Sequence, residues 1–129
     1  MENIVIEATE RAPELRFDFA AQRFSMKGES YPEDVSAFFG APIESLQSHL
    51  RAQEGAAITF DFELVYFNSS SAKVLMRIFD MLEEAASNGN TVVINWRHLA
   101  DDDNMAELGE EFGEDLEEAE FNLVEVEEA

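Results

Sequence analysis

Residues 58–73 read ITFDFELVYFNSSSAK and carry the clearest structural signal in this chain of 129 residues. Over residues 58–64 every second side chain is apolar, which is the pattern of a half-buried β-strand. The polar face weakens at residues 65–67 (VYF), so we expect the strand to enter the interior of the sheet there. The polar run at residues 68–73 then predicts the passage from a central strand to a helix.

The residues that follow predict this helix and a second central strand. Apolar side chains recur every three or four positions, which is the spacing of one helix face. Asn88-Gly89 ends the pattern, because glycine readily takes the left-handed conformation. Residues 91–96 (TVVINW) are apolar enough for a central strand, and a right-handed crossover would make it parallel to the first. The helix face consists of Leu75, Ile78, Phe79, Leu82 and Ala86.

The N-terminal third predicts strands and a first helix. Residues 15–19 alternate, residues 20–22 can turn the chain, and the alternation returns at Phe24 and Met26, which indicates an antiparallel hairpin. Residues 4–5 predict a further edge strand. The helix face that follows consists of Val35, Phe38, Phe39, Ile43, Leu46 and Leu50.

This first helix has predicted boundaries and one interruption. Residues 30–33 (SYPE) open it, since the missing N–H of Pro32 would be unpaired in a first turn. Gly40 and Pro42 interrupt the apolar pattern, so we expect a kink or a break there. Gly55 ends the element.

The C-terminal segment, residues 101–129, predicts a helix and a tail of strongly negative charge. It holds fourteen of the 29 acidic residues and no Lys or Arg. Three readings stay open: a solvated helix face, a docking surface for a basic partner, and a metal site. Residues 101–104 (DDDN) predict a helix cap, and residues 121–124 a short final strand. The helix face between them consists of Met105, Leu108, Phe112 and Leu116.

Together these elements predict an α/β fold. We expect one domain over residues 1–129, a layer sandwich of a mixed β-sheet with helices mainly on one face. The chain is 46% hydrophobic, with eleven Phe, which excludes wholesale disorder. Its net charge of −21 argues against nucleic acid and anionic membranes as partners. With no signal peptide and no membrane span, we expect a cytoplasmic protein.

The sequence offers little for catalysis, metals or cofactors. It has no cysteine, no glycine-rich phosphate loop and no nucleophile elbow. His49 and His98 lie on different elements, which argues against a shared metal site. Only Asp61 and Glu63, on the polar side of the central strand, merit inspection as a general acid. We therefore expect no enzyme activity, no metal and no cofactor.

The serines in residues 68–73 allow two interpretations. Serine side chains commonly accept hydrogen bonds from the first free N–H groups of a helix, so in one interpretation the run is a cap, with Ser70 and Ser71 as the capping residues. Alternatively, a kinase phosphorylates one of them. A phosphate there would meet the positive end of the helix dipole and add negative charge to the surface.

Five landmarks occur in a characteristic order along the chain: residues 28–33 (GESYPE), 64–73 (LVYFNSSSAK), 82–85 (LEEA), 93–96 (VINW) and the acidic helix at 107–115. In this order they resemble the SiaC family of bacterial regulatory phosphoproteins, and the resemblance covers residues 4–124. The family looks like a relative of the STAS domain, the fold of anti-sigma-factor antagonists.

The resemblance implies a partner switch. A serine/threonine kinase phosphorylates the hydroxyl residue after the asparagine, which is Ser69 here, and a PP2C-type phosphatase removes the phosphate. A family member carries threonine at this position, followed by two serines, whereas this chain has three consecutive serines. Ser70 and Ser71 are therefore the alternative phosphorylation sites. In the family the unphosphorylated protein binds a diguanylate cyclase and activates it, which raises cyclic di-GMP and promotes biofilm formation, and the resemblance implies the same for this chain. The partner-binding residues would be Asn68, Ser69, Ser70 and Lys73.

Two other functions remain open at this point. A protein of the same fold could act on another target, such as an anti-sigma factor. A small acidic ligand-binding protein or enzyme is the third hypothesis.

Overall fold

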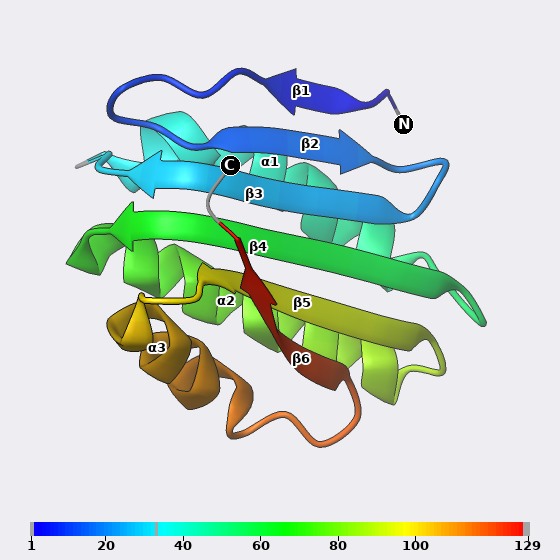
Figure 1. Cartoon of the computed structure of the whole chain (residues 1–129). Coiled ribbons are helices and arrows are strands. Elements are labelled where there is room, and N and C mark those ends of the chain that lie inside the picture. Colours follow the sequence, from blue (N-terminus) through cyan, green and yellow to red (C-terminus); the bar gives the residue numbers. More distant parts are fainter. Residues whose placement is uncertain (1, 33, 128–129) are drawn as a thin grey trace.

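The computed structural model describes residues 2–32 and 34–127, and Figure 1 shows one sheet with helices packed against it. The strands lie in the order β1-β2-β3-β4-β5-β6. The first three are antiparallel, whereas β3 to β6 run parallel. In chain order the elements are β1 (Ile4–Ile6), β2 (Glu14–Asp18), β3 (Arg23–Ser30), α1 (Val35–Arg51), β4 (Ala57–Phe67), α2 (Ser69–Ser87), β5 (Thr91–Leu99), α3 (Asp103–Gly113) and β6 (Glu120–Val126).

The expected α/β sandwich on a mixed sheet is confirmed. In Figure 1, α1 and α2 lie behind the sheet, and α3 packs near α2, with the rings of Phe79 and Phe112 5.5 Å apart. The hairpin between β2 and β3, the edge strand β1 and the parallel pairing of β4 with β5 are as expected. Among the described residues, no helix combines the length and apolar character that a membrane crossing requires.

The core lies between the sheet and its helices. Phe60 and Phe62 of β4 are fully buried, and Phe62 packs on Phe79 of α2 at 5.2 Å between ring centroids. Burial of each such side chain contributes roughly 1.5–3 kcal/mol. The buried apolar face of β4 therefore holds the central strand against α2.

The end of β4 does not enter the sheet interior. Val65 is 52% and Tyr66 44% exposed, so that prediction is wrong. The pairing of β4 with β5 stops at Phe62, which faces Trp96. Beyond that point the strand has a partner on the β3 side only, and the side chains of Val65 and Tyr66 reach solvent.

The predicted start and end of α1 are also wrong. The N-cap is Asp34, whose carboxylate accepts a hydrogen bond from the Ala37 N–H at 3.1 Å, whereas Ser30 is the last residue of β3. The helix ends at Arg51, and Gly55 lies in the following turn, where its φ of 65° suits glycine.

The predicted break at Gly40 and Pro42 is absent, because α1 is one continuous helix. Phe39 and Ile43 are buried on either side of Pro42, which is itself buried. Packing of this face against the core offsets the hydrogen bond that proline removes.

The C-terminal elements differ in length from the prediction. Asp102 caps α3 by accepting from the Met105 N–H at 3.0 Å, which confirms the cap. The helix ends at Gly113, before Leu116, and a Cβ at that glycine would lie 2.7 Å from the ring of Phe121. The final strand β6 is longer than expected and pairs with β5.

Candidate functional site

The connection from β4 to α2 is held by Asn68. Its side-chain oxygen accepts a hydrogen bond from the Ser71 N–H at 2.8 Å, so Asn68 is the N-cap of α2. Its amide nitrogen donates to the Pro32 carbonyl at 3.2 Å, and its backbone N–H donates to the Ser30 carbonyl at 3.0 Å. These bonds fix the start of α2 against the end of β3.

The three serines that follow lie in different environments. Ser69 is the first helical residue and is exposed, Ser70 is half-buried, and Ser71 is 2% exposed. The hydroxyl of Ser71 shares a hydrogen bond of 2.7 Å with the hydroxyl of Ser30. The expectation that Ser70 and Ser71 cap the helix is therefore wrong, because Asn68 caps it and Ser71 bonds to β3. Ser69 is the most accessible of the three hydroxyls to a kinase.

We expect Ser71→Ala to destabilise the protein by about 1–3 kcal/mol, because the Ser30 hydroxyl is left buried without its partner. Ser70→Ala should change the free energy of unfolding by less than about 0.5 kcal/mol, as is usual away from the core. Urea denaturation measures both. The double variant Ser30→Ala/Ser71→Ala should recover part of the loss, and equal effects of Ser70→Ala and Ser71→Ala would contradict the assigned contact.

Two exposed residues lie close to Ser69 in the chain, Tyr66 three positions before it and Lys73 four positions after it. Lys73 is exposed and lies four residues along α2, where helical side chains are neighbours. Tyr66 stacks on Tyr31 with their rings 4.7 Å apart, and the Arg11 guanidinium lies 5.8 Å from the centre of the Tyr31 ring. The structure thus offers a phosphate acceptor, a cation and an exposed aromatic surface together.

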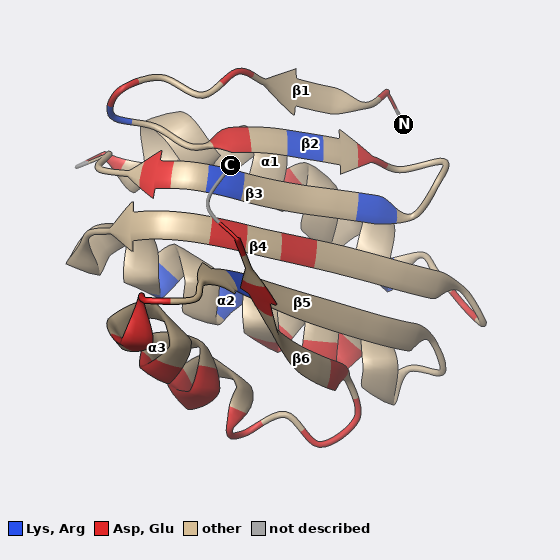
Figure 2. Ribbon diagram, in the orientation of Figure 1, with Lys and Arg blue, Asp and Glu red and all other residues tan. Residues whose placement is uncertain are grey.

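Beside this site a groove of about 430 Å³ runs between α2 and α3. The charged residues that line it are all acidic, and Figure 2 shows Asp and Glu gathered along α3 and the segment that leads to β6. Met76, one of the apolar lining residues, is 56% exposed. The lining residues are Phe67, Ala72, Met76, Phe79, Asp80, Glu83, Leu108, Glu111, Phe112, Asp115 and Leu116.

Glu83 lines this groove and connects α2 to the segment after α3. Its carboxylate accepts hydrogen bonds from the backbone N–H groups of Glu117, Glu118 and Ala119, the closest at 2.6 Å. Partial burial acts to raise the pKa of Glu83, but the three backbone bonds outweigh it and hold the pKa below its usual 4.5. The ionised carboxylate therefore ties the segment after α3 to α2.

The contribution of Glu83 to stability should depend on pH. A lowered pKa in the folded protein means that the contribution is complete above about 4.5 and is lost as the pH falls through the folded-state value. We expect Glu83→Gln to lower the free energy of unfolding at pH 7 by about 1 kcal/mol. Urea denaturation of both proteins from pH 7 to pH 3 should show that the difference in their free energies of unfolding becomes smaller. A difference that is independent of pH would contradict a stabilising role of the ionised Glu83 carboxylate.

The other candidate positions do not form a site. Asp61 accepts a hydrogen bond from Asn95 at 2.8 Å, and Glu63 pairs with Lys27 at 3.3 Å, so both carboxylates have partners. Burial lowers the pKa of His49, whose Nε2 lies 2.7 Å from Gln22 Oε1. Across residues 2–32 and 34–127, no group of three or more His, Asp or Glu is placed to hold a metal ion.

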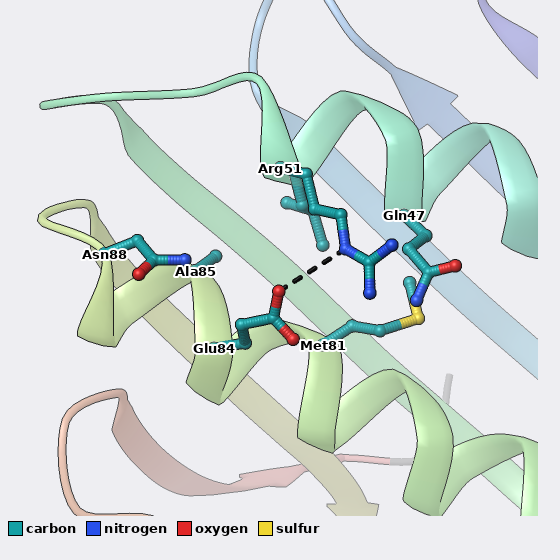
Figure 3. A pocket seen from close by; sticks show the side chains of 7 residues that line it. Gln47, Arg51, Met81, Glu84, Ala85 and Asn88 are labelled. Atoms are coloured by element: carbon teal, nitrogen blue, oxygen red, sulfur yellow. Dashed lines mark hydrogen bonds and ion pairs between the residues drawn. The ribbon is translucent and has the colours of Figure 1, made fainter.

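A small hollow between α1 and α2 is too small for a ligand. Figure 3 shows it where the Arg51 Nε lies 3.4 Å from Glu84 Oε1. Its volume is about 10 Å³, which holds at most one water molecule.

Sequence reasoning predicts Asn68, Ser69, Ser70 and Lys73 as partner-binding residues, and it did not identify the groove beside the start of α2. Met76 gave a signal that could have been used, since it is a large apolar residue off the predicted helix face. The stacking of Tyr31 on Tyr66 gave none, because it depends on how β3 and β4 are paired.

Comparison with known proteins identifies the family of this chain. The chain matches the family described as SiaC family regulatory phosphoprotein over residues 6–126. An uncharacterised protein of Pseudomonas aeruginosa is 38% identical over 115 residues, which cover 89% of this chain and 90% of that protein.

Solved structures agree with the sequence match. SiaC of Pseudomonas aeruginosa has a TM-score of 0.83 and 35% identity, covering 99% of this chain and 100% of the other. A chain in the crystal structure of the Pseudomonas aeruginosa diguanylate cyclase SiaD in complex with its activator SiaC has a TM-score of 0.89 and 36% identity, covering 95% of this chain and 99% of the other. The chain therefore belongs to the SiaC family of regulatory phosphoproteins.

Proposed function

We propose that this protein is a phosphorylation-controlled partner switch that activates a diguanylate cyclase. In its unphosphorylated form it binds the cyclase, which raises cyclic di-GMP and promotes biofilm formation. A serine/threonine kinase phosphorylates Ser69, and a PP2C-type phosphatase reverses the modification. Residues 1–129 act as one regulatory domain.

The observation that carries this proposal is the exposed hydroxyl of Ser69 on a rigid helix start. Asn68 and Ser71 hold the backbone on both sides through their bonds to Pro32 and Ser30. A kinase can therefore reach the hydroxyl without unfolding the helix. The cyclase as target is supported by the related complex of SiaD with its activator SiaC.

The proposed binding surface contains Asn68, Ser69, Ser70 and Lys73. Exposed Tyr66 and Met76 extend it with apolar area, and aromatic side chains commonly dominate the energy of such interfaces. Lys73 is placed to pair with a phosphate four residues before it. Asn68 acts through positioning, since its side chain caps the helix.

We propose that the protein acts by binding rather than by catalysis, and that it works in the cytoplasm beside its cyclase and kinase. The family description as a regulatory phosphoprotein supports this role. No metal or cofactor is required for it.

Affinity capture from the native cell tests the proposal. Tagged Ser69→Ala should recover a diguanylate cyclase, and Ser69→Asp should recover less of it, although one carboxylate imitates a phosphate poorly. Recovery of an anti-sigma factor without any cyclase by Ser69→Ala would contradict the assigned target.

Partner binding should weaken as salt is added. The net charge of −21 attracts a basic partner mainly by speeding association. Between about 50 mM and about 500 mM salt the screening length shortens several-fold, so the association rate measured by surface plasmon resonance should fall. A rate that stays constant over this range would show that the acidic surface is only solvated.

A further inference from the structure

We infer that the groove between α2 and α3 binds an amphipathic helix rich in Lys and Arg, presented by the partner protein. The inference rests on the proposed function, since it names the chemistry of the partner segment that the switch holds. The groove was defined above by its eleven lining residues, and its volume of about 430 Å³ lies in the range of ligand sites.

The floor of the groove is apolar and well anchored. Phe79 is buried in the core and packs against Phe112 of α3. Leu108, Phe112 and Leu116 come from α3 and the segment after it, and all three are half-buried. An apolar side chain from a partner would cover these residues and Met76 together.

The length of the groove suits a helix. On α2 it extends from Ala72 to Glu83, which spans about 16 Å of helix axis at 1.5 Å per residue. That length accommodates apolar anchors at positions i, i+4 and i+7 of a helix lying in the groove. Ala72 lies one turn after Ser69, so the groove begins beside the phosphorylation site.

The charged residues at the rim of the groove indicate the charge of the partner segment that binds there. Asp80, Glu83, Glu111 and Asp115 are the four charged lining residues, and all are acidic. Within the described ranges, none of them forms an ion pair with Lys or Arg of this chain. Cationic side chains flanking the apolar anchors would therefore find the carboxylates of Asp80, Glu111 and Asp115 without an ion-pair partner in this part of the chain, whereas the Glu83 carboxylate already accepts backbone hydrogen bonds.

The same charge argues against a second copy of this chain as occupant. Each copy carries a net charge of −21, and its longest segment without Lys or Arg is acidic. Docking such a surface against the acidic rim places like charges together, which opposes association. The partner segment is therefore basic and foreign to this chain.

A designed peptide tests the groove without the cyclase. The probe is a fluorescein-labelled helix of about 18 residues, a length at which isolated helices begin to form, with Leu at i, i+3, i+4 and i+7 spacing and Lys elsewhere. A scrambled peptide of the same composition is the control. Fluorescence anisotropy should give an affinity at least about tenfold higher for the amphipathic peptide.

Two matched pairs of variants locate the binding. Met76→Lys should weaken it by about tenfold or more, whereas Val5→Lys, at an equally exposed apolar position on β1, should not. Glu111→Lys should weaken it more than Glu54→Lys, which makes the same change in net charge in the turn before β4. Equal effects within both pairs would overturn the groove as the docking site.

NMR spectroscopy gives a second readout that does not depend on variants. Addition of the peptide should shift the amide signals of Ala72, Met76, Leu108 and Phe112. Shifts confined to the outer acidic face of α3, or a dimer of this chain that closes the groove, would also overturn the inference. Peptide binding without cyclase activation would instead contradict the proposed function and leave the groove assignment intact.

Discussion

Stoichiometric phosphorylation of Ser69 should lower the affinity for the diguanylate cyclase by about a hundredfold or more. Ser69 is the first residue of α2, and Tyr66, three residues before it in the chain, is 44% exposed. A partner that covers this apolar area must remove water from the phosphate. Desolvation of an ion at an interface costs several kcal/mol when no buried partner compensates it, and each 1.4 kcal/mol is a factor of ten in affinity.

Attraction between the phosphate and a basic partner segment would offset this loss of affinity only weakly. The attraction between a surface phosphate and an exposed cation is worth about 0–1 kcal/mol. Lys73, four residues along the same helix, is placed to pair with the phosphate and so reduces the attraction left for the partner. Desolvation therefore exceeds the Coulomb gain, and the phosphorylated protein should dissociate.

Three measurements check this prediction. Mass spectrometry after kinase treatment should place the phosphate on Ser69, and calorimetry should show the loss of affinity for the cyclase. The melting temperature should change little, because a helix N-terminus stabilises a phosphate by roughly 0.3–1 kcal/mol. Phosphate on Ser70 or Ser71 with Ser69 unmodified, or unchanged affinity of the Ser69-phosphorylated protein, would contradict the assignment.

The second large effect concerns the packing of α3. Gly109 lies against the indole of Trp96, which is 1% exposed and donates a hydrogen bond to the Met105 carbonyl at 3.0 Å. A Cβ at Gly109 would come within 2.6 Å of Nε1 and 2.8 Å of Cγ of that ring. We expect Gly109→Ala to lower the free energy of unfolding by about 1–3 kcal/mol, because α3 must move off the sheet.

Gly40 provides the matched control in α1. A Cβ there would have no neighbour within 4 Å, so Gly40→Ala should stabilise the protein by up to about 1 kcal/mol through the higher helix propensity of alanine. Urea denaturation compares the two variants directly. The same sign of change for both would show that the contact with Trp96 does not limit this position.

The elements that could be predicted from the sequence are those in which the spacing of apolar residues agrees with which side chains are buried in the fold. The alternation of Phe60 and Phe62 located the central strand, and Asn88-Gly89 located the end of α2, where Gly89 has a φ of 97°. These features are local, since side-chain direction in a strand and chain reversal at glycine depend on a few neighbouring residues.

The errors arose where tertiary contacts decide the outcome. Val65 and Tyr66 are exposed because β5 does not accompany β4 beyond Phe62, which local sequence cannot show. The helix α1 passes through Pro42 because both neighbouring apolar positions pack on the core.

The candidate site depends only in part on local sequence. The position after Asn68 predicts Ser69 as the phosphorylated residue, but the different environments of Ser69 and Ser71 depend on Ser30, whose hydroxyl contacts Ser71 across 41 positions of the chain. The groove depends on the packing of α3 beside α2, which residue patterns in either helix alone do not specify.

The rate of cyclic di-GMP synthesis by a purified diguanylate cyclase tests the central claim most directly. The cyclase is assayed with GTP alone, with this protein unphosphorylated, and with this protein phosphorylated at Ser69, and the cyclase encoded in the same genome is the enzyme to use. The account predicts a higher rate with the unphosphorylated protein and the basal rate with the phosphorylated one. Equal rates with the two forms, or stimulation by the phosphorylated form alone, would contradict it.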